Sequence, residues 1–316
     1  MKIPHIVHRA DLPALGIDDA ERRRLLRAGR MTRAGVWYVT VDVPADLVSL
    51  LTEGVRPSCV TAAEHHGLWV PLHEGVHVYR PRGLGTAGTA SGRADPSARR
   101  STSASGIPIL DPGLVPPAPV LSAHVPGPTG TGSGLVEHGS KMRSWPDRDP
   151  IADLPLALAQ AARCLPVRDT AILLESALNL RKMTMAAVRR LLASLPSALR
   201  AQFARVSPMA GSGTETAVRW WLESLHVPVS PQVSIPGVGR VDLKLGTSWI
   251  IECDSASFHD DPAQYHRDRA RDLRLQARRY MVTRLTWEQV FLDWEATSTQ
   301  LLTILRRRDH RRPLAG

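Results

Sequence analysis

Hydrophobic and polar residues alternate with a period of two in two neighbouring stretches of the C-terminal third. In the first stretch, RVDLKL, apolar residues 241, 243 and 245 alternate with Arg240, Asp242 and Lys244. In the second, Ile251 and Cys253 alternate with Glu252 and Asp254. Alternation of this kind predicts two strands, each with one apolar face, and the intervening residues 246–248 (GTS) predict the loop of an antiparallel hairpin. Counting back from that loop places Asp242 opposite Glu252, with their Cβ atoms about 4.5–5.5 Å apart.

Two carboxylates at that separation repel each other and raise one pKa, unless a cation lies between them. Asp242 and Glu252, together with the backbone carbonyl of Cys253, offer only oxygen donors, which favours Mg²⁺ or Mn²⁺ over zinc. The alternative is that both acids are ordinary polar residues on a solvated sheet face, beside Arg240 and Lys244. The sequence around them favours the metal site.

A helix is predicted just before this hairpin, where Ser212 is followed three residues later by Glu215. This spacing is that of a capping box, in which Glu215 satisfies a backbone N–H at the helix start. An equally weighted alternative is that Glu215 is a ligand of the same metal site.

A second, strongly charged helix follows the hairpin, with Arg267 and Arg271 at a spacing of four. Such ladders are usually solvated helix surface. If residues 270, 273 and 277 form its buried stripe, these arginines are free to meet phosphates or the acidic cluster, with Asp268 and Asp272 orienting them.

The order of these pieces resembles the very-short-patch-repair-like (Vsr-like) branch of the PD-(D/E)XK nuclease superfamily. The matching pieces are GSGTETAVRWWLE, RVDL, IIECD with a nearby histidine, RD-x-x-RD-x-x-L and MVTRL followed by TWEQV. The resemblance implies a mixed sheet flanked by helices and hydrolysis of DNA with Mg²⁺ (or Mn²⁺). It makes Glu215 the first acidic position, Asp242 the central metal ligand and Glu252 the second. Asp254 stands where many members carry lysine, and His259 matches a histidine that assists catalysis.

The N-terminal 80 residues predict a small basic unit. A short helix is expected from His8 to Leu15, and a second from Asp18 to Gly29; MTRAGVWYVTV then predicts a strand pair. This unit resembles the abbreviated winged-helix domain of AbiEi-type antitoxins, which implies DNA binding. The alternative is a basic, solvated helix that only packs on its neighbour. The phosphate contacts would come from the second helix, through Arg22, Arg23, Arg24 and Arg27.

Histidines and cysteines offer a weaker metal hypothesis. Four histidines lie between residues 65 and 77, but HEGVH falls among strand-like residues and has no partner at a suitable spacing. Cys59, Cys164 and Cys253 are too far apart along the chain for a thiolate zinc motif and suggest no disulfide framework. No metal is therefore expected at these residues.

Composition agrees with a nucleic-acid partner. The chain has 316 residues, 40 Lys and Arg against 30 Asp and Glu, and a net charge of +10, which favours a polyanion and most simply DNA. The start, MKIPHIVHRADLPALG, lacks the apolar core of a signal peptide and no long apolar run follows, so we expect a cytoplasmic protein with no membrane partner. A homodimer is left open.

We therefore expect a multidomain α+β or α/β protein. The predicted parts are a winged-helix-like DNA-binding domain (1–80), a flexible Gly-, Ser- and Pro-rich linker or insertion (81–134), a helical connector (135–205) and a Vsr-like nuclease-fold domain with a basic tail (206–316). The leading hypothesis is a metal-dependent DNA endonuclease. The alternatives are a transcriptional regulator of the antitoxin or phage-repressor kind on a non-catalytic nuclease fold and, less favoured, an RNA-directed toxin component.

Overall fold

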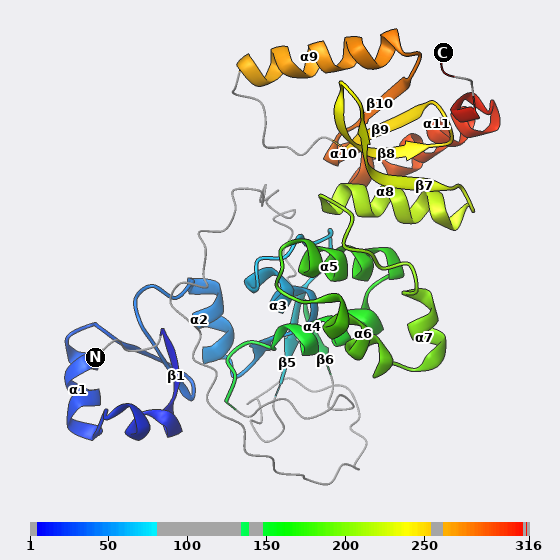
Figure 1. The fold of residues 1–316 in the computed structure, drawn as a ribbon. Helices are drawn as coiled ribbons and strands as arrows, with labels where there is room; N and C mark the ends of the chain where they lie inside the picture. Colours follow the sequence, from blue (N-terminus) through cyan, green and yellow to red (C-terminus); the bar gives the residue numbers. More distant parts are fainter. Residues whose placement is uncertain (1–4, 81–133, 139–147, 254–261, 312–313, 315–316) are drawn as a thin grey trace. The chain divides into compact units, whose positions relative to one another are not determined.

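The chain is an α+β protein with eleven α-helices and three small sheets in the part that the structure describes (Figure 1). Among these residues, no helix combines the length and the apolar character needed to cross a bilayer. Its described residues divide into two compact units, one containing residues 5–62, 75–80, 134–138 and 148–153, the other containing residues 63–74, 154–253 and 262–311. The structure, a computed structural model, describes residues 5–80, 134–138, 148–253, 262–311 and 314, with only the backbone of 262–268.

The first unit begins with a three-stranded antiparallel sheet in the order β1-β3-β2. The predicted basic helix and strand pair are confirmed, and Asp18 caps the helix by accepting the N–H of Glu21 at 2.8 Å. The predicted helix from His8 to Leu15 is wrong: two 3-10 turns form there, because Pro13 lacks the N–H that a continuous helix needs. The elements are β1 (Ile6–His8), η1 (Arg9–Asp11), η2 (Pro13–Leu15), α1 (Asp19–Arg27), β2 (Thr32–Ala34) and β3 (Trp37–Val39).

A second three-stranded sheet in the same unit has the order β4-β5-β6. Its last strand, β6 (Leu135–His138), runs parallel to β5, with Tyr79 opposite His138. Within the segment predicted as a helical connector, these four residues therefore form a strand, and the helices begin only at Leu154. The remaining elements here are α2 (Ala45–Thr52), β4 (Arg56–Pro57), α3 (Cys59–His65) and β5 (Val76–Tyr79).

Four helices open the second unit's main segment, as the helical rhythm of residues 154–205 predicts. Pro166 and Pro196 are the N-cap residues of the second and fourth, where the missing N–H of proline costs no helical hydrogen bond. The second helix is the most buried, because residues 170–178 are all shielded from solvent. The four are α4 (Leu154–Cys164), α5 (Val167–Asn179), α6 (Met185–Ala193) and α7 (Ser197–Gln202).

A mixed four-stranded sheet in the order β10-β9-β8-β7 forms the rest of this unit. The predicted hairpin register is confirmed: Leu245 pairs with Trp249 and Leu243 pairs with Ile251. The last strand, β10, runs parallel to β9. The elements are α8 (Gly213–Ser224), β7 (Val229–Ile235), β8 (Gly239–Leu245), β9 (Trp249–Cys253), α9 (Pro262–Ala277), β10 (Met281–Leu285), α10 (Trp287–Phe291) and α11 (Trp294–Arg306).

Both faces of this sheet are covered, which explains why all five residues of β9 are buried. On one side, Val218 and Leu222 of α8 pack against Leu243 and Ile251. On the other, Leu275 of α9 packs against Ile250. A polar side chain on β9 is therefore enclosed, not solvated.

A buried ion pair joins α5 to α8. The carboxylate of Glu175, which is fully buried, accepts hydrogen bonds from the guanidinium of Arg219, from the indole N–H of Trp220 at 3.1 Å and from the backbone N–H of Ser207 at 3.0 Å. Its other oxygen accepts the hydroxyl of Thr216 at 2.9 Å. Both oxygens of Glu175 are thus hydrogen-bonded and its charge is paired, so this group fixes α5 to α8. Arg219 also pairs with Glu223 at 2.8 Å.

The basic C-terminal segment contacts the β8–β9 loop. The carbonyl of His310, in the 3-10 turn η3 (Asp309–Arg311), accepts the N–H of Thr247 at 2.9 Å, and the carbonyl of Asp309 accepts the hydroxyl of Ser248 at 3.2 Å. Residues 309 and 310 of the basic tail are therefore held in place, because the hairpin loop supplies donors for their carbonyls.

Candidate acidic site

The candidate site lies along one row of residues across the four-stranded sheet. Gln232 on β7 and Asp242 on β8 lie between the pairs Pro231–Leu243 and Val233–Val241, and Arg284 on β10 is opposite Glu252 on β9. The β8–β9 ladder ends at Leu243, and the next step of its register places Asp242 opposite Glu252. Residues in one such row point to the same face of a sheet, so the two predicted carboxylates are brought together.

The Asp242 carboxylate lies where the backbone ladder stops. Its Oδ2 accepts the backbone N–H of Cys253 at 2.9 Å, which ties the end of β9 to the side chain on β8. The metal bond predicted for the Cys253 carbonyl stays a prediction, because this contact is made by the N–H of that residue.

Glu215 reaches the same cluster from the start of α8. Ser212 caps that helix through its hydroxyl, which accepts the N–H of Glu215 at 3.1 Å. The Glu215 carboxylate does not complete the reciprocal capping box. Its Oε2 accepts the N–H of Gly211 at 2.8 Å and the side-chain amide of Gln232 at 2.5 Å. Ser212 therefore caps the helix through its hydroxyl. The Glu215 carboxylate takes no part in this cap and lies in the acidic cluster.

Gln232 was missed by sequence reasoning. Its amide nitrogen bridges two acids, Oε2 of Glu215 at 2.5 Å and Oδ1 of Asp242 at 3.5 Å. Its φ of 53° is in the left-handed region, which is unusual for a side chain other than glycine and is typical of functional sites. The available signal was its position opposite Asp242 in the hairpin register, but a backbone turn of this kind leaves no trace in the sequence.

Burial and mutual repulsion dominate the electrostatics. Glu215 and Glu252 are only 5% and 3% exposed. Burial, and after it the negative charge of Asp242, raise the pKa of both carboxyl groups to about 7. The hydrogen bond from Gly211 opposes the shift at Glu215, and the Arg271 guanidinium opposes it at Glu252. The negative charge of the three acids is therefore only partly compensated by the neighbouring cations and hydrogen-bond donors.

Among the described side chains, Arg271 supplies a cation in direct contact with this cluster. One guanidinium nitrogen donates to Oε1 of Glu252 at 2.8 Å and to the backbone carbonyl of Arg240. The expectation that Asp272 orients Arg271 is wrong, because Asp272 accepts instead from Arg284 at 2.6 Å. Of its predicted alternatives, phosphate or the acidic cluster, Arg271 here contacts the cluster.

The predicted buried stripe of α9 is also wrong. Leu273 is 66% exposed, whereas Leu275 is completely buried against the sheet. The helix is so polar that a single leucine makes its main apolar contact, and periodicity alone does not identify which one. Asp254 and His259 lie outside the described residues. Arg267 and Asp268 belong to α9, but their side chains also lie outside the described part.

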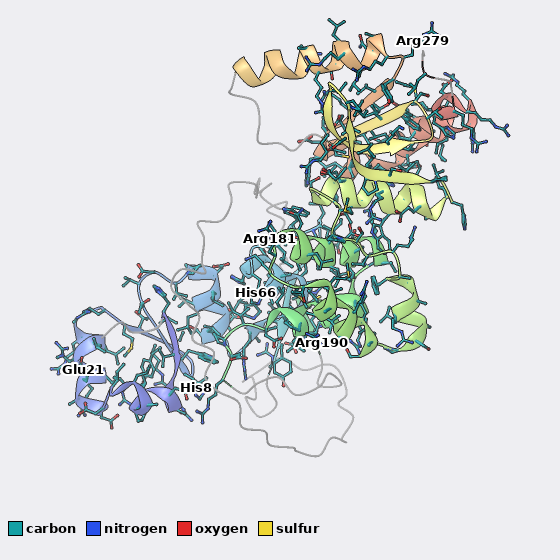
Figure 2. The ribbon with its side chains drawn as sticks, viewed as in Figure 1. His8, Glu21, His66, Arg181, Arg190 and Arg279 are labelled. Carbon is teal, nitrogen blue, oxygen red and sulfur yellow. The ribbon has the colours of Figure 1, made fainter. Side chains whose placement is uncertain are left out.

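The predicted DNA-binding arginines lie on α1 in the first unit and fall into two classes. Arg22 pairs with Asp19 at 2.8 Å, and Arg24 pairs with Glu21, labelled in Figure 2, at 2.6 Å. Arg23 and Arg27 are exposed, and the only hydrogen bond between them joins the Arg27 guanidinium to the Arg23 carbonyl at 3.3 Å. Their positive charges are therefore available to a polyanion.

No family model matches the chain, and no curated protein is significantly similar to it. The function therefore has to be argued from the geometry of the sites.

Proposed function

We propose that the protein is a metal-dependent DNA endonuclease, with its reactive centre at Glu215, Asp242 and Glu252 and a DNA-binding surface on α1. The observation that supports this most is a cluster of three carboxylates, two of them buried, whose mutual repulsion the guanidinium groups of Arg271 and Arg284 only partly offset. A divalent cation would remove this repulsion, and the donor set fits a hard cation because every side-chain donor is oxygen.

Asp242 and Glu252 would hold Mg²⁺ or Mn²⁺, with the backbone carbonyl of Cys253. When bound, such an ion lowers the pKa of water and stabilises charge on a phosphate. Glu215, with its pKa raised to about 7, exchanges a proton near neutrality and is suited to accept one from the attacking water. Gln232 holds the Glu215 and Asp242 carboxylates in place through its amide.

Arg271 is the described residue best placed to meet the scissile phosphate. Its side chain is 21% exposed, so its guanidinium can meet a phosphate oxygen that approaches the acidic cluster. Asp254 and His259 stay the catalytic candidates that the nuclease resemblance implies, with His259 assisting proton transfer. Arg267 stays a candidate for binding phosphate because of its place in the charge pattern of α9. We expect the basic net charge to attract DNA to both units.

One observation favours a second function. Arg271 pairs with Glu252 directly, and a guanidinium in that position could permanently supply the positive charge that a metal ion would otherwise provide. The protein would then be a DNA-binding regulator on a non-catalytic nuclease fold. The two functions differ in whether added metal displaces this ion pair and starts cleavage.

The test uses the purified full-length chain on supercoiled plasmid and on short matched and mismatched duplexes, with Mg²⁺, Mn²⁺ or EDTA. We expect cleavage that needs metal and that falls by about 100-fold or more in Asp242→Asn, because losing a ligand removes several kcal/mol of transition-state stabilisation. Glu295→Gln, an exposed carboxylate on α11, is the matched control and should keep wild-type rates. Wild-type rates in Asp242→Asn would contradict the proposal. DNA binding with no cleavage in any metal would favour the regulator.

A further inference from the structure

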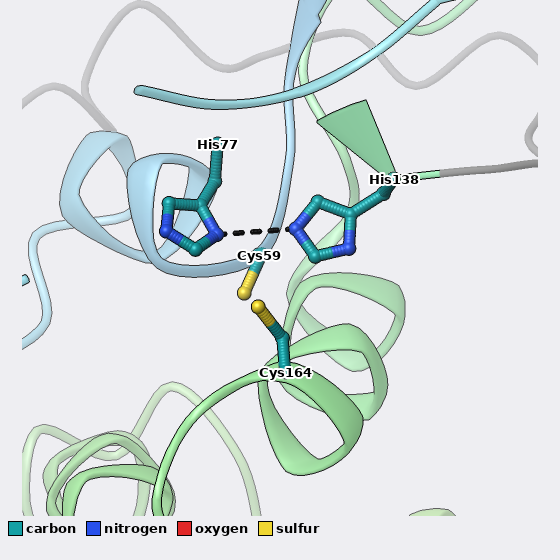
Figure 3. Close-up of side chains that lie close together, drawn as sticks. All are labelled: Cys59, His77, His138 and Cys164. Carbon is teal, nitrogen blue, oxygen red and sulfur yellow. Dashed lines mark hydrogen bonds between the residues drawn. The ribbon is translucent and has the colours of Figure 1, made fainter. Parts of the chain in front are cut away.

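Two cysteines and two histidines form a second, separate cluster in the described part of the chain. One ligand atom from each of Cys59, His77, His138 and Cys164 lies within 4.8 Å of all the others (Figure 3). The two imidazoles face each other through Nδ1 of His77 and Nε2 of His138, 3.1 Å apart. Neither cysteine is in a disulfide. Such a convergence of soft and borderline donors is typical of a metal site.

The local fold holds three of these residues in place. Cys59, the first residue of α3, has a φ of 49°, again in the left-handed region. The backbone of His77, on strand β5, is held by two hydrogen bonds. The N–H of His77 donates to the hydroxyl of Thr61 at 2.8 Å, and the carbonyl of His77 accepts the N–H of Ser58 at 2.9 Å. His138 ends β6, the parallel neighbour of β5. The backbone therefore presents the thiol and both imidazoles to one point without any metal present.

We propose that Cys59, His77, His138 and Cys164 bind one Zn²⁺ ion with tetrahedral geometry. Bonds of 2.0–2.1 Å to nitrogen and 2.3 Å to sulfur place tetrahedral ligand atoms about 3.3–3.8 Å from one another. The cluster has this size, since its imidazole nitrogens are 3.1 Å apart and no pair of its ligand atoms exceeds 4.8 Å. Two thiolates and two imidazoles select zinc over the Mg²⁺ expected at the acidic site.

The site is structural in kind, because four side chains fill all four positions and leave none for a reacting water. It would fasten the short strands β5 and β6, which pair over only four residues, to the start of α3. Strands this short are marginal without such support. The zinc site does not depend on the proposed nuclease activity, and either can fail without the other.

The first experiment measures metal in the full-length chain, purified without chelator or added zinc. We expect about one zinc per chain by elemental analysis, and a cobalt-substituted form with the thiolate-to-metal absorption of a tetrahedral site. Removing the metal with a chelator should lower the Tm by several degrees, and Zn²⁺ but not Mg²⁺ should restore it. A chain without zinc whose Tm does not respond to Zn²⁺ would overturn the proposal. So would an intact mass lower by two hydrogens, which shows a Cys59–Cys164 disulfide.

Single variants then assign the ligands. Cys59→Ser and His138→Asn should lose most of the bound zinc, whereas Cys164→Ser should reduce the thiolate-to-cobalt absorption by about half, because one of two thiolates is removed. His66→Asn (His66 is labelled in Figure 2) and Cys253→Ala are matched controls outside the cluster and should keep full zinc content. Competition for Zn²⁺ against a colorimetric chelator, done only on variants with a wild-type circular dichroism spectrum, separates a lost ligand from a lost fold. Full zinc content in both Cys59→Ser and His138→Asn would place the metal elsewhere and overturn the assignment.

Discussion

Two groups of buried carboxylates in the second unit differ in how their charge is compensated. Glu175 has no exposed surface, and its partners supply one cation and hydrogen bonds to both oxygens. Glu215 and Glu252 are buried almost as deeply, yet a third acid, Asp242, lies beside them, and the charges of Arg271 and Arg284 only partly oppose the rise in the pKa of Glu252. Burial alone therefore does not identify a functional acid, whereas burial with incomplete compensation does.

The difference also separates stability from function in physical terms. A satisfied ion pair contributes to the fold mainly because breaking it leaves an unpaired charge inside the protein. An unsatisfied acidic cluster costs stability until a proton or a cation arrives. The first group should therefore respond to mutation through unfolding, and the second through pH and divalent metal.

The largest expected effect comes from Glu175→Gln. This change keeps the shape of the side chain but removes the buried charge that Arg219, Trp220 and Thr216 contact, and Glu223 becomes the remaining carboxylate partner of Arg219 at 2.8 Å. The free energy of unfolding should therefore fall by about 3–5 kcal/mol. Urea unfolding followed by circular dichroism measures it. The double variant Glu175→Gln, Arg219→Met should recover part of the loss, because the buried guanidinium is then gone and Glu223 keeps Arg205 as a partner at 3.4 Å. A loss below about 1 kcal/mol in the single variant would show that the charge of Glu175 is no better compensated by its partners than the charges of the acidic cluster are.

The acidic cluster should instead make stability depend on pH. Unfolded, the carboxyl groups of Glu215 and Glu252 ionise near their ordinary value of 4.5, whereas in the folded protein they keep their protons until about pH 7. The fold therefore loses stability as the pH rises from about 4.5 to 7, by about 3 kcal/mol for such a shift in one group. In Asp242→Asn the decline should become shallower without vanishing, because burial is the larger cause of both shifts.

Urea unfolding at a series of pH values measures this decline. Millimolar Mg²⁺ should reduce it in the wild-type protein and leave it unchanged in Asp242→Asn, because a bound cation replaces the protons. Glu295→Gln should behave as wild type throughout. An equal decline in wild type and Asp242→Asn would mean that Asp242 does not act on its neighbours. A decline that Mg²⁺ does not alter would leave the geometry intact but count against the metal site.

The sequence predicts the acidic hairpin well for a physical reason. Alternation of apolar residues fixes which face of each strand is buried, and a three-residue loop fixes the register, so the pairing of Asp242 with Glu252 needs only local information. Gln232 shows the limit of this reasoning, because its left-handed backbone depends on tertiary contacts. The local pattern likewise does not determine which leucine of α9, Leu273 or Leu275, is buried against the sheet.

The Cys59 cluster shows the same limit for long-range contacts. His77 is the single member, among the four histidines predicted as unsuited to metal, that the structure brings into the cluster. Its partners come from segments far away in the sequence, so the spacing rules for metal motifs had nothing to match. Glu175 was missed for a similar reason, because its cation lies on another helix.

The smallest effect concerns the arginines of α1, where compensated and uncompensated charges again lie side by side. Arg24 is neutralised by Glu21 at 2.6 Å, whereas Arg23 and Arg27 are exposed. If α1 contacts DNA, Arg23→Ala with Arg27→Ala should weaken binding several-fold and reduce the slope of log K against log salt by about 0.9 for each lost phosphate contact, because fewer counterions are released.

Fluorescence anisotropy with a labelled duplex across a salt series measures both quantities. Arg24→Ala is the matched control: it removes the same side chain from the same helix, but Glu21 already cancels much of its charge, so its slope should stay closer to wild type. Cleavage at saturating DNA should be unchanged in all of these variants, because the acidic cluster lies in the other unit. An unchanged slope in the Arg23, Arg27 double variant would show that α1 does not bind phosphate. Equal losses in Arg24→Ala and in the double variant would show that pairing with a neighbouring acid does not withdraw an arginine from DNA, and the distinction between compensated and uncompensated charge would fail at this surface.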